Sequence, residues 1–520
     1  MSPNKRIFLN VVATYGRSLY ALVLGLFTSR WVLASLGEVD YGLIGLVGGL
    51  IAFVSFFNNL LSSAVMRFYA VSVGASHVCE DKDTGLEDCR KWFSTAVMIH
   101  TTIPVMLVVA GYPVGEWAVR SFLTIPADRI EACVWVWRFT CLSCFIAMVN
   151  VPFQAMYTAK QEIAELTLYS VAATTVNACF CAYMMTHPGF WLVKYAACLC
   201  LIGVIPQLLI GGNAVLRFRE CRLRFAYMFD FDRVKALVSY AGAKLWNNLG
   251  DIFSSQGQAV LVNKYLGPRF NASMSVAHAV SVHTSTLSLS LGTGYWPAIA
   301  NAAGARDEGR VKILTFQLCR IGSVMLLLFA LPLSLEIHEV MRLWLKTPPT
   351  FSAEIALAML IVMVLGNLCD GYWMAVMGLG RGVWLYNFCV GWSGFVRFSL
   401  AWILFSLGFR MWGLWIAIVS GSFCTLIMRW WLGRKLLGYS IRYWARSVLL
   451  PIVALIVLSS AAGLPARITM APSFGRVVLT TLCSVSVLIV CAWTIVLTAE
   501  EKGRVTAKLM SIIGKFRRIG

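Results

Sequence analysis

The sequence predicts an all-α polytopic membrane protein with about fourteen membrane-spanning helices. Two observations carry this prediction. Hydrophobic residues make up 59% of the 520 residues and charged residues only 13%, whereas soluble globular proteins usually contain about 25% charged residues. In addition, apolar stretches recur that reach the roughly 20 residues a helix needs to cross about 30 Å of hydrocarbon.

The predicted spans fall on the two sides of a basic connection at 216–234. Each is an apolar stretch that ends at polar, charged, Gly or Pro residues. The spans before the connection are 8–34, 40–72, 91–119, 133–159, 163–186 and 189–215. The spans after it are 235–265, 271–302, 310–335, 352–378, 382–408, 411–437, 443–465 and 474–499. A shift of 230 residues lays Leu36-Gly37 on Leu266-Gly267, which suggests an internal repeat of the kind common in transporters.

The net charge of +20 at pH 7 is distributed unevenly among the connecting segments. Lys and Arg are concentrated in alternate segments, above all at 216–234, at 429–446 and in the tail at 502–518, which is the pattern of the positive-inside rule. We therefore expect both termini and the 216–234 connection to be cytoplasmic. This distribution favours contact of the basic residues with membrane lipids, through anionic headgroups, over binding of nucleic acid.

No metal site or other cofactor is predicted. Most of the 16 cysteines lie inside apolar spans, where cysteine acts as a small hydrophobe. The chain also lacks the Gly-x-x-x-x-Gly-Lys-[Ser/Thr] loop that holds nucleotide phosphates. The cluster Gly378-Leu-Gly380-Arg-Gly382 has no preceding strand and is interpreted as a turn between helices.

Several predicted spans carry polar residues at helical spacing. In the seventh span six such residues recur every three or four positions, and at roughly 100° per residue they form one stripe that cannot face lipid. They are Lys244, Asn247, Asn248, Asp251, Ser255 and Gln258. Arg17 shares a face of the first span with Asn10 and Thr14. These polar faces predict a hydrated cavity between helices of the two halves.

Charges within the spans are mostly cationic. The cations are Arg17, Arg30, Arg67, Arg138, Lys244, Arg320 and Arg397, and the anions are Asp251 and Asp370. Because an intramembrane charge usually faces a pathway or a partner, the excess of cations predicts an anionic cargo. The guanidinium fork suits phosphate. The alternative is that cations near span ends extend to the interface, and that Arg397 pairs with an acid.

The residues predicted to bind substrate are Arg17, Arg138, Arg397, Lys244 and Asn248. Asp251 and Asp370 are predicted to couple transport to a cation, H⁺ or Na⁺, because a carboxylate in a polar stripe changes charge when it is loaded. The alternative for Asp251 is structural: Lys244 lies two helical turns away, and a salt bridge between neighbouring helices would neutralise it.

The segment Arg30-Trp-Val-Leu-Ala-Ser-Leu36-Gly37-Glu-Val-Asp-Tyr41-Gly42 joins the first two spans. It resembles the start of the polysaccharide flippases in the multidrug/oligosaccharidyl-lipid/polysaccharide (MOP) exporter superfamily, in which an Arg is followed by Leu-Gly and then Tyr-Gly. The second half keeps Leu266-Gly267 but has Asn271-Ala272 in place of Tyr-Gly. The resemblance implies two six-helix bundles around a central cavity, at 1–215 and 235–437, joined by 216–234 and followed by two extra helices and a basic tail at 438–520.

The same resemblance implies a function. Such a flippase moves a polyprenyl-diphosphate-linked, anionic oligosaccharide from the cytoplasmic to the periplasmic leaflet of the bacterial inner membrane by alternating access, alongside other glycan-assembly proteins. A cation-coupled multidrug exporter of the same superfamily is the main alternative, because such exporters carry acids where Asp251 and Asp370 stand. A membrane enzyme, such as a glycan polymerase or acyltransferase, is a third reading that the short outer loops disfavour. We expect no enzymatic activity.

Overall fold

The computed structural model describes the backbone of residues 3–49, 65–66, 68–69, 72, 82–160, 162–499, 501–503 and 506. Side chains are described for these residues apart from 3–15, 18–19, 82–85, 239–241, 243–244, 286–294, 296–297, 300–301 and 304. Every regular element of this part of the chain is a helix, which confirms the predicted all-α class.

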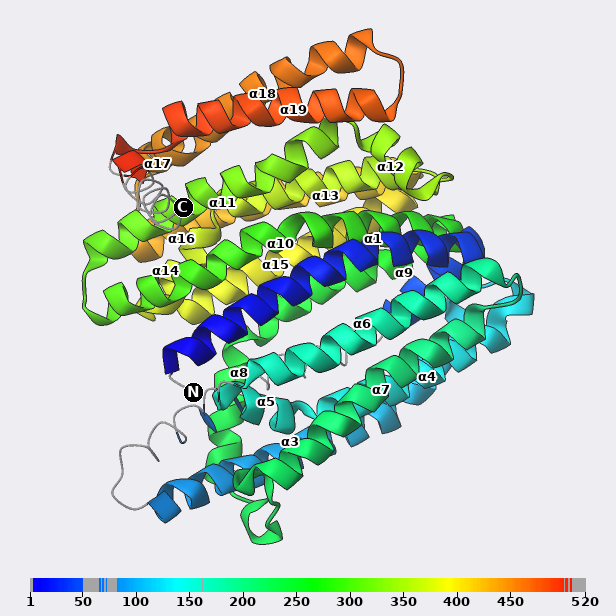
Figure 1. The fold of residues 1–520 in the computed structure, drawn as a ribbon, viewed down its shortest axis with the longest axis vertical. Coiled ribbons are helices and arrows are strands. Elements are labelled where there is room, and N and C mark those ends of the chain that lie inside the picture. The colour runs from blue at the N-terminus through cyan, green and yellow to red at the C-terminus, as the bar shows by residue number, and fades with distance from the viewer. Residues whose placement is uncertain are drawn as a thin grey trace, which may run out of the picture. The chain divides into compact units, whose positions relative to one another are not determined.

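Helices follow one another with short connections (Figure 1). Their bounds are α1 Pro3–Gly49, α3 Lys82–Trp117, α4 Ile130–Val149, α5 Val151–Ala159, α6 Ile163–Thr186, α7 Leu192–Arg217, α8 Phe231–Ile252, α9 Gln258–Leu266, α10 Pro268–Gly304, α11 Glu308–Leu335, α12 Ile337–Leu345, α13 Ser352–Asn367, α14 Asp370–Leu379, α15 Val383–Ser406, α16 Arg410–Leu437, α17 Ile441–Trp444, α18 Leu450–Thr469 and α19 Phe474–Cys491. The predicted turn at 378–382 is confirmed, because Gly380 and Gly382 adopt positive φ values of 68° and 64° between α14 and α15.

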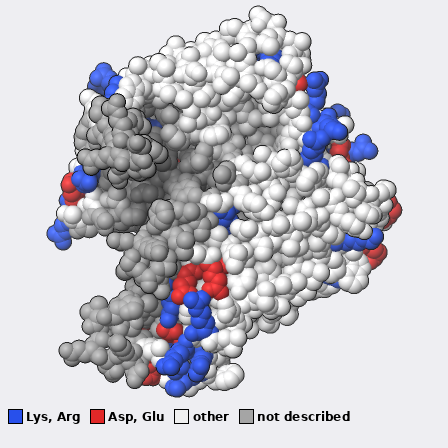
Figure 2. Space-filling view, viewed as in Figure 1, with Lys and Arg blue, Asp and Glu red and all other residues white. Residues whose placement is uncertain are grey.

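Ten helices of the described chain are long and apolar enough to cross a membrane, and the pair α13 and α14, bent by 42°, makes an eleventh span if it is counted as one. Within this part of the chain, α8 and α10 are not among the ten; in α8, polar residues such as Asn247, Asn248 and Asp251 lower the hydropathy. Figure 2 shows charged side chains gathered in a few groups, with broad areas between them that carry no Lys, Arg, Asp or Glu. The multi-pass class is confirmed, and the number of about fourteen spans stays a prediction.

Spatial proximity divides the chain into two compact units. Unit 1 comprises Met1–Ala279, Pro349–Ser352 and Asn387–Ala417, and unit 2 comprises Val280–Pro348, Ala353–Tyr386 and Ile418–Gly520. The division predicted from the sequence, with boundaries at 215, 234 and 437, stays a prediction.

Two glycines in unit 1 support the predicted internal repeat. Gly37 breaks α1 with φ 75° and ψ 171°, and Gly267 separates α9 from α10 with φ 89° and ψ 173°. A Cβ at either position would meet nothing within 4 Å, so the positive φ, and not lack of space, favours glycine at both. The aligned Leu-Gly pairs therefore make the same backbone turn between consecutive helices.

In unit 1, α4 packs against α3 and α7, and α6 packs against α1 and α7 (Figure 1). The basic connection after α7 is tied to neighbouring helices. Arg217 pairs with Glu165 at 2.5 Å, Lys160 with Glu220 at 2.7 Å, and Arg233 with Asp88 at 2.7 Å. The connection thus forms part of the folded unit.

In unit 2, α18 and α19 form a hairpin that packs on α11 (Figure 1). Two well-buried ion pairs fasten α11 to this region, one near the middle of the helix and one at its C-terminal end. Arg320 pairs with Glu501, which lies beyond α19 in the sequence, at 2.7 Å. Glu336, at the end of α11, pairs with Arg476 of α19 at 2.7 Å. Thr480 donates a further hydrogen bond of 3.0 Å to Glu336. Removing one partner of a buried ion pair lowers the stability of the folded protein by several kcal/mol. These contacts therefore hold the hairpin in place.

Candidate functional site

The polar stripe predicted in 235–265 is interrupted. α8 ends at Ile252 and a π-helical turn, Phe253–Gly257, precedes α9. A π-helical turn contains more residues than an α-helical turn, so it rotates the residues after it relative to those before it. Asp251 is exposed over 64% of its side chain, whereas Gln258 is buried at 2% and donates to the carbonyl oxygen of Arg397 at 3.4 Å. The single continuous stripe is therefore wrong.

A close crossing of α8 and α15 positions Asp251 within unit 1. A Cβ added to Gly250 would lie 2.1 Å from the carbonyl oxygen of Gly391, and one added to Gly394 would lie 2.1 Å from that of Gly250. The two backbones therefore touch, which only glycine permits. One turn further along, Arg397 Nη2 lies 3.9 Å from Asp251 Oδ1. The acid of α8 and the arginine of α15 form a long ion pair whose acid is exposed.

The structural alternative for Asp251 was a salt bridge with Lys244. The side chain of Lys244 lies outside the described residues, and the ion pair that the structure gives for Asp251 is with Arg397. The alternative that Arg397 pairs with an acid is thus realised. Asn248 is half-buried on α8, in the turn before Asp251.

Arg138 lies on α4 and is only partly neutralised. Its Nε donates to the hydroxyl of Tyr112 at 3.1 Å, and its guanidinium lies 4.9 Å from the ring centre of Trp135. The Glu116 carboxylate is 3.9 Å away, but it pairs more closely with Arg120, at 2.9 Å. One carboxylate therefore serves two arginines.

Arg17 is half-buried on α1 and forms no ion pair with a residue that the structure describes. Of the other intramembrane cations, Arg30 is half-buried, Arg67 lies outside the described residues, and Arg320 is held by Glu501. Extension of Arg320 to the interface stays a prediction. Arg17, Arg138 and Arg397 lie on three different helices of unit 1, α1, α4 and α15.

Asp370 lies at a break between two helices in unit 2. It begins α14, directly after the bend that ends α13. Arg429 of α16 donates to Asp370 Oδ1 at 2.8 Å and to the carbonyl oxygen of Gly366 at 3.4 Å. Trp444 donates to the carbonyl oxygen of Leu368 at 3.0 Å. The carbonyl of Gly366 also accepts from the amide of Cys369 at 3.1 Å, so Arg429 gives it a second donor at the break.

Sequence reasoning missed Arg429, because it was grouped with the basic residues at 429–446 that set the orientation. The available signal was its depth: Arg429 lies two turns before the end of α16 at Leu437. The residues Asn367 to Gly371 would also have indicated the break, since Asn and Gly are weak helix formers.

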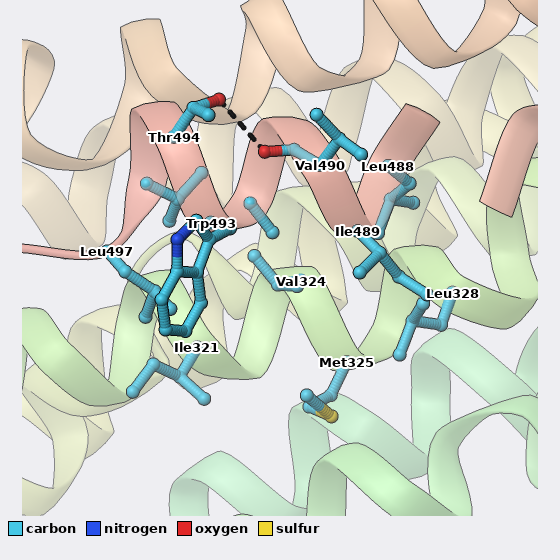
Figure 3. Close-up of a pocket in the computed structure, with 12 residues that line it drawn as sticks. Ile321, Val324, Met325, Leu328, Leu488, Ile489, Val490, Trp493, Thr494 and Leu497 are labelled. Atoms are coloured by element: carbon cyan, nitrogen blue, oxygen red, sulfur yellow. Dashed lines mark hydrogen bonds between the residues drawn. The ribbon is translucent and has the colours of Figure 1, made fainter. Parts of the chain in front are cut away.

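An apolar hollow of about 420 Å³ lies elsewhere in unit 2, between α11 and the C-terminal end of α19 (Figure 3). It is lined by side chains such as Ile321, Met325, Ile489 and Trp493 and contains none of the predicted site residues. Among the residues with described placement, no three His, Cys, Asp or Glu side chains lie together in a way that could hold a metal ion.

The fold matches solved transporter structures over nearly the whole chain. Lipid II flippase MurJ in an inward closed conformation superposes with a TM-score of 0.62 at 12% identity, over 93% of this chain and 98% of that one. An inward-facing multidrug resistance MATE family transporter of the MOP superfamily gives a TM-score of 0.62 at 16% identity, over 81% and 94%. The chain therefore shares the fold of these solved structures. No family model and no curated protein matches the sequence.

The matched structures are a multidrug transporter and a lipid II flippase. At these low identities the match concerns the fold alone. The cargo has to be argued from this chain's own residues.

Proposed function

We propose that the chain is a flippase that moves a polyprenyl-diphosphate-linked anionic oligosaccharide from the cytoplasmic to the periplasmic leaflet by alternating access, for surface polysaccharide synthesis. The MOP fold supports a transport function. The match to a lipid II flippase, which extends over 93% of this chain, supports a lipid-linked cargo.

The observation that carries the proposal is the incomplete neutralisation of the arginines in unit 1. Arg138 shares its carboxylate with Arg120, and Arg17 has no ion pair with a described residue. An arginine inside the membrane keeps its charge, because its pKa exceeds about 12. Such a group favours an anionic partner, and its planar fork matches the oxygens of a diphosphate.

The test uses cells in which this chain is the only flippase for the surface glycan. We expect Arg17→Ala to lose most transport, because a hydrogen bond to a charged group contributes roughly 1.5 to 3 kcal/mol. Arg17→Lys keeps the charge without the fork and should retain part of it. Surface glycan and the lipid-linked precursor on the cytoplasmic leaflet are measured together.

Arg467→Ala is the control, since Arg467 is exposed near the end of α18 and should transport normally. Normal surface glycan in the triple variant Arg17→Ala, Arg138→Ala, Arg397→Ala would rule out the diphosphate cargo. The triple variant must reach the membrane at wild-type abundance for the comparison.

A cation-coupled multidrug exporter is the second candidate. It is favoured by the exposure of Asp251, an acid available for H⁺ or Na⁺, and by a TM-score to the MATE transporter equal to that of the flippase. Drug sensitivity caused by Asp251→Asn, with surface glycan unchanged, would favour the exporter. Precursor accumulation without drug sensitivity would favour the flippase.

Orientation in the bacterial inner membrane, with both termini cytoplasmic, is part of the proposal. Ala226 is exposed in the basic connection, so a membrane-impermeant thiol reagent should label Ala226→Cys in inverted vesicles but not in intact cells. Native Cys221 is unsuitable for this test because it is buried, and burial raises the pKa of its thiol. Labelling of Ala226→Cys in intact cells above the wild-type level would show that the connection faces the outside, and would contradict the proposed orientation.

A further inference from the structure

A polar hollow of about 430 Å³ lies in unit 2 at the start of α17. Arg442, Tyr443, Arg446 and Ser447 line it. Its volume is within the range of about 300 to 1,000 Å³ that is usual for ligand sites. None of these residues belongs to the transport site proposed above.

The two arginines of the hollow lie on one helical face. Arg442 and Arg446 are four residues apart, which brings side chains together on a helix surface. Arg446 and Ser447 lie in the π-helical turn Ala445–Leu449, a local distortion that is frequent at functional sites. The Ser447 hydroxyl donates to the carbonyl oxygen of Tyr443 at 2.6 Å, and this contact fixes the serine beside the arginines.

Neither arginine is neutralised by a residue that the structure describes: no such carboxylate forms an ion pair with Arg442 or Arg446, and both are exposed. Nearby acids of unit 2 are engaged elsewhere, Glu308 with Arg381 and Glu501 with Arg320. The sequence of 504–520 contains no Asp or Glu, so that tail offers no counter-charge. Two adjacent guanidinium groups without an acid attract an anion.

Exposed aromatic side chains accompany cations around the hollow. Tyr443 is 48% exposed and Trp431, in the last two turns of α16, is 44% exposed. Lys312 lies 5.0 Å from the ring centre of Tyr443, and Lys435 lies 4.9 Å from that of Trp431. Exposed Tyr and Trp beside cations are enriched where lipid headgroups begin, so this composition favours a membrane interface.

We propose that this hollow binds a phosphate group, with Arg442 and Arg446 as the fork that holds it, and that its source is the headgroup of an anionic membrane lipid. Ser447 and Tyr443 complete the polar wall. The site is independent of the cargo that the transport site carries. A lipid held there would fix the junction between α16 and α17 at the membrane surface.

The test measures lipid binding to the purified full-length protein by native mass spectrometry, with dioleoylphosphatidylglycerol added in detergent. We expect Arg442→Gln with Arg446→Gln to weaken binding of one phosphatidylglycerol by about 10- to 100-fold. A hydrogen bond to a charged group contributes about tenfold or more to affinity. Arg442→Lys with Arg446→Lys retains the charge but loses the fork, and should bind with intermediate affinity.

Arg434→Gln with Lys435→Gln is the matched control, because it also removes two positive charges, at the end of α16 and outside the residues that line the hollow. It should bind the lipid as the wild type does. Equal losses in both double variants, or no loss in either, would overturn the proposal.

A second arm adds inorganic phosphate to the lipid-bound protein at millimolar concentration. Retention of the lipid supports the headgroup as the source. Displacement of the lipid, again only where Arg442 and Arg446 are intact, would overturn the lipid assignment and leave a soluble phosphate compound as the ligand. Thermal unfolding of each variant in the same detergent verifies that lost binding is not lost folding.

Discussion

Two acid–arginine pairs, one in each unit, differ in the distance between their charged atoms and in the other contacts of the arginine. Asp251 and Arg397 are 3.9 Å apart, whereas Asp370 and Arg429 are 2.8 Å apart and Arg429 also caps the carbonyl of Gly366. The first pair joins two continuous helical segments that touch through glycines. The second bridges a break between two helices, where Arg429 contacts both a carboxylate and a backbone carbonyl.

The difference teaches how to separate a structural charge from a functional one. An arginine that binds both a carboxylate and a backbone carbonyl stabilises the fold, and its acid is engaged. A long pair with an exposed acid contributes little stability. We therefore propose cation coupling for Asp251 before Asp370.

The crossing that supports the loose pair should be the most sensitive feature. Gly250→Ala places a Cβ 2.1 Å from the carbonyl oxygen of Gly391, and we expect a loss of about 1 to 3 kcal/mol as α8 and α15 separate. Gly242→Ala is the matched control on the same helix, because a Cβ there meets nothing within 4 Å, and it should stabilise α8 by up to about 1 kcal/mol. Thermal unfolding of the purified protein measures both, and equal shifts would contradict the crossing.

The tight pair should come next. Arg429→Gln leaves Asp370 and the carbonyl of Gly366 without their charged donor, and we expect a loss of about 1.5 to 3 kcal/mol, seen as a lower unfolding midpoint and lower abundance in the membrane. Arg429→Lys keeps the charge but reaches only one acceptor well, so its loss should be smaller. An unfolding midpoint equal to that of the wild type for Arg429→Gln would show that the helix break is stable without Arg429.

Asp251→Asn tests the other side of the comparison. We expect a change in stability below about 1 kcal/mol, because a long ion pair with an exposed acid is weak. Transport should nevertheless lose its dependence on the proton or Na⁺ gradient, since the amide cannot be charged. Transport assays in vesicles with and without each gradient measure this. Retained coupling with lost abundance would make Asp251 structural.

The smallest effect is expected for Arg397→Lys. The ammonium group keeps the charge near Asp251, and the unfolding midpoint should change by less than about 0.5 kcal/mol in equivalent free energy. If Arg397 contacts the cargo phosphate, transport falls while stability does not, because lysine loses the bidentate geometry. Parallel loss of both would instead point to a packing role.

Sequence patterns could predict what depends on local composition. The apolar spans, the turn at 378–382 and the paired turns at Gly37 and Gly267 follow from hydropathy and from the conformational freedom of glycine. The structure gives the two glycines ψ values within 2° of each other. Such features need no knowledge of distant residues.

Features set by partners far along the chain could not be predicted. The prediction of one polar stripe from Lys244 to Gln258 assumed a regular helix with 100° per residue. The π-helical turn at Phe253–Gly257 breaks that regularity. The partner of Asp251 is Arg397, because two glycine-lined backbones meet there. In the sequence, Arg429 looks like one of the basic residues that set the orientation in the membrane. Only the tertiary fold shows that it bridges the break between α13 and α14.

The fastening of α11 to the C-terminal hairpin has a consequence for biogenesis. Arg320 and Glu501 are 181 positions apart, and Glu336 and Thr480 are 144 apart. At roughly 5 to 20 residues per second of synthesis, Arg320 is made about 10 to 40 seconds before its counter-charge exists. During that interval Arg320, near the middle of α11, and Glu336, at its end, lack their final partners. We therefore expect a chain that stops before residue 476 to hold α11 less firmly than the full chain does.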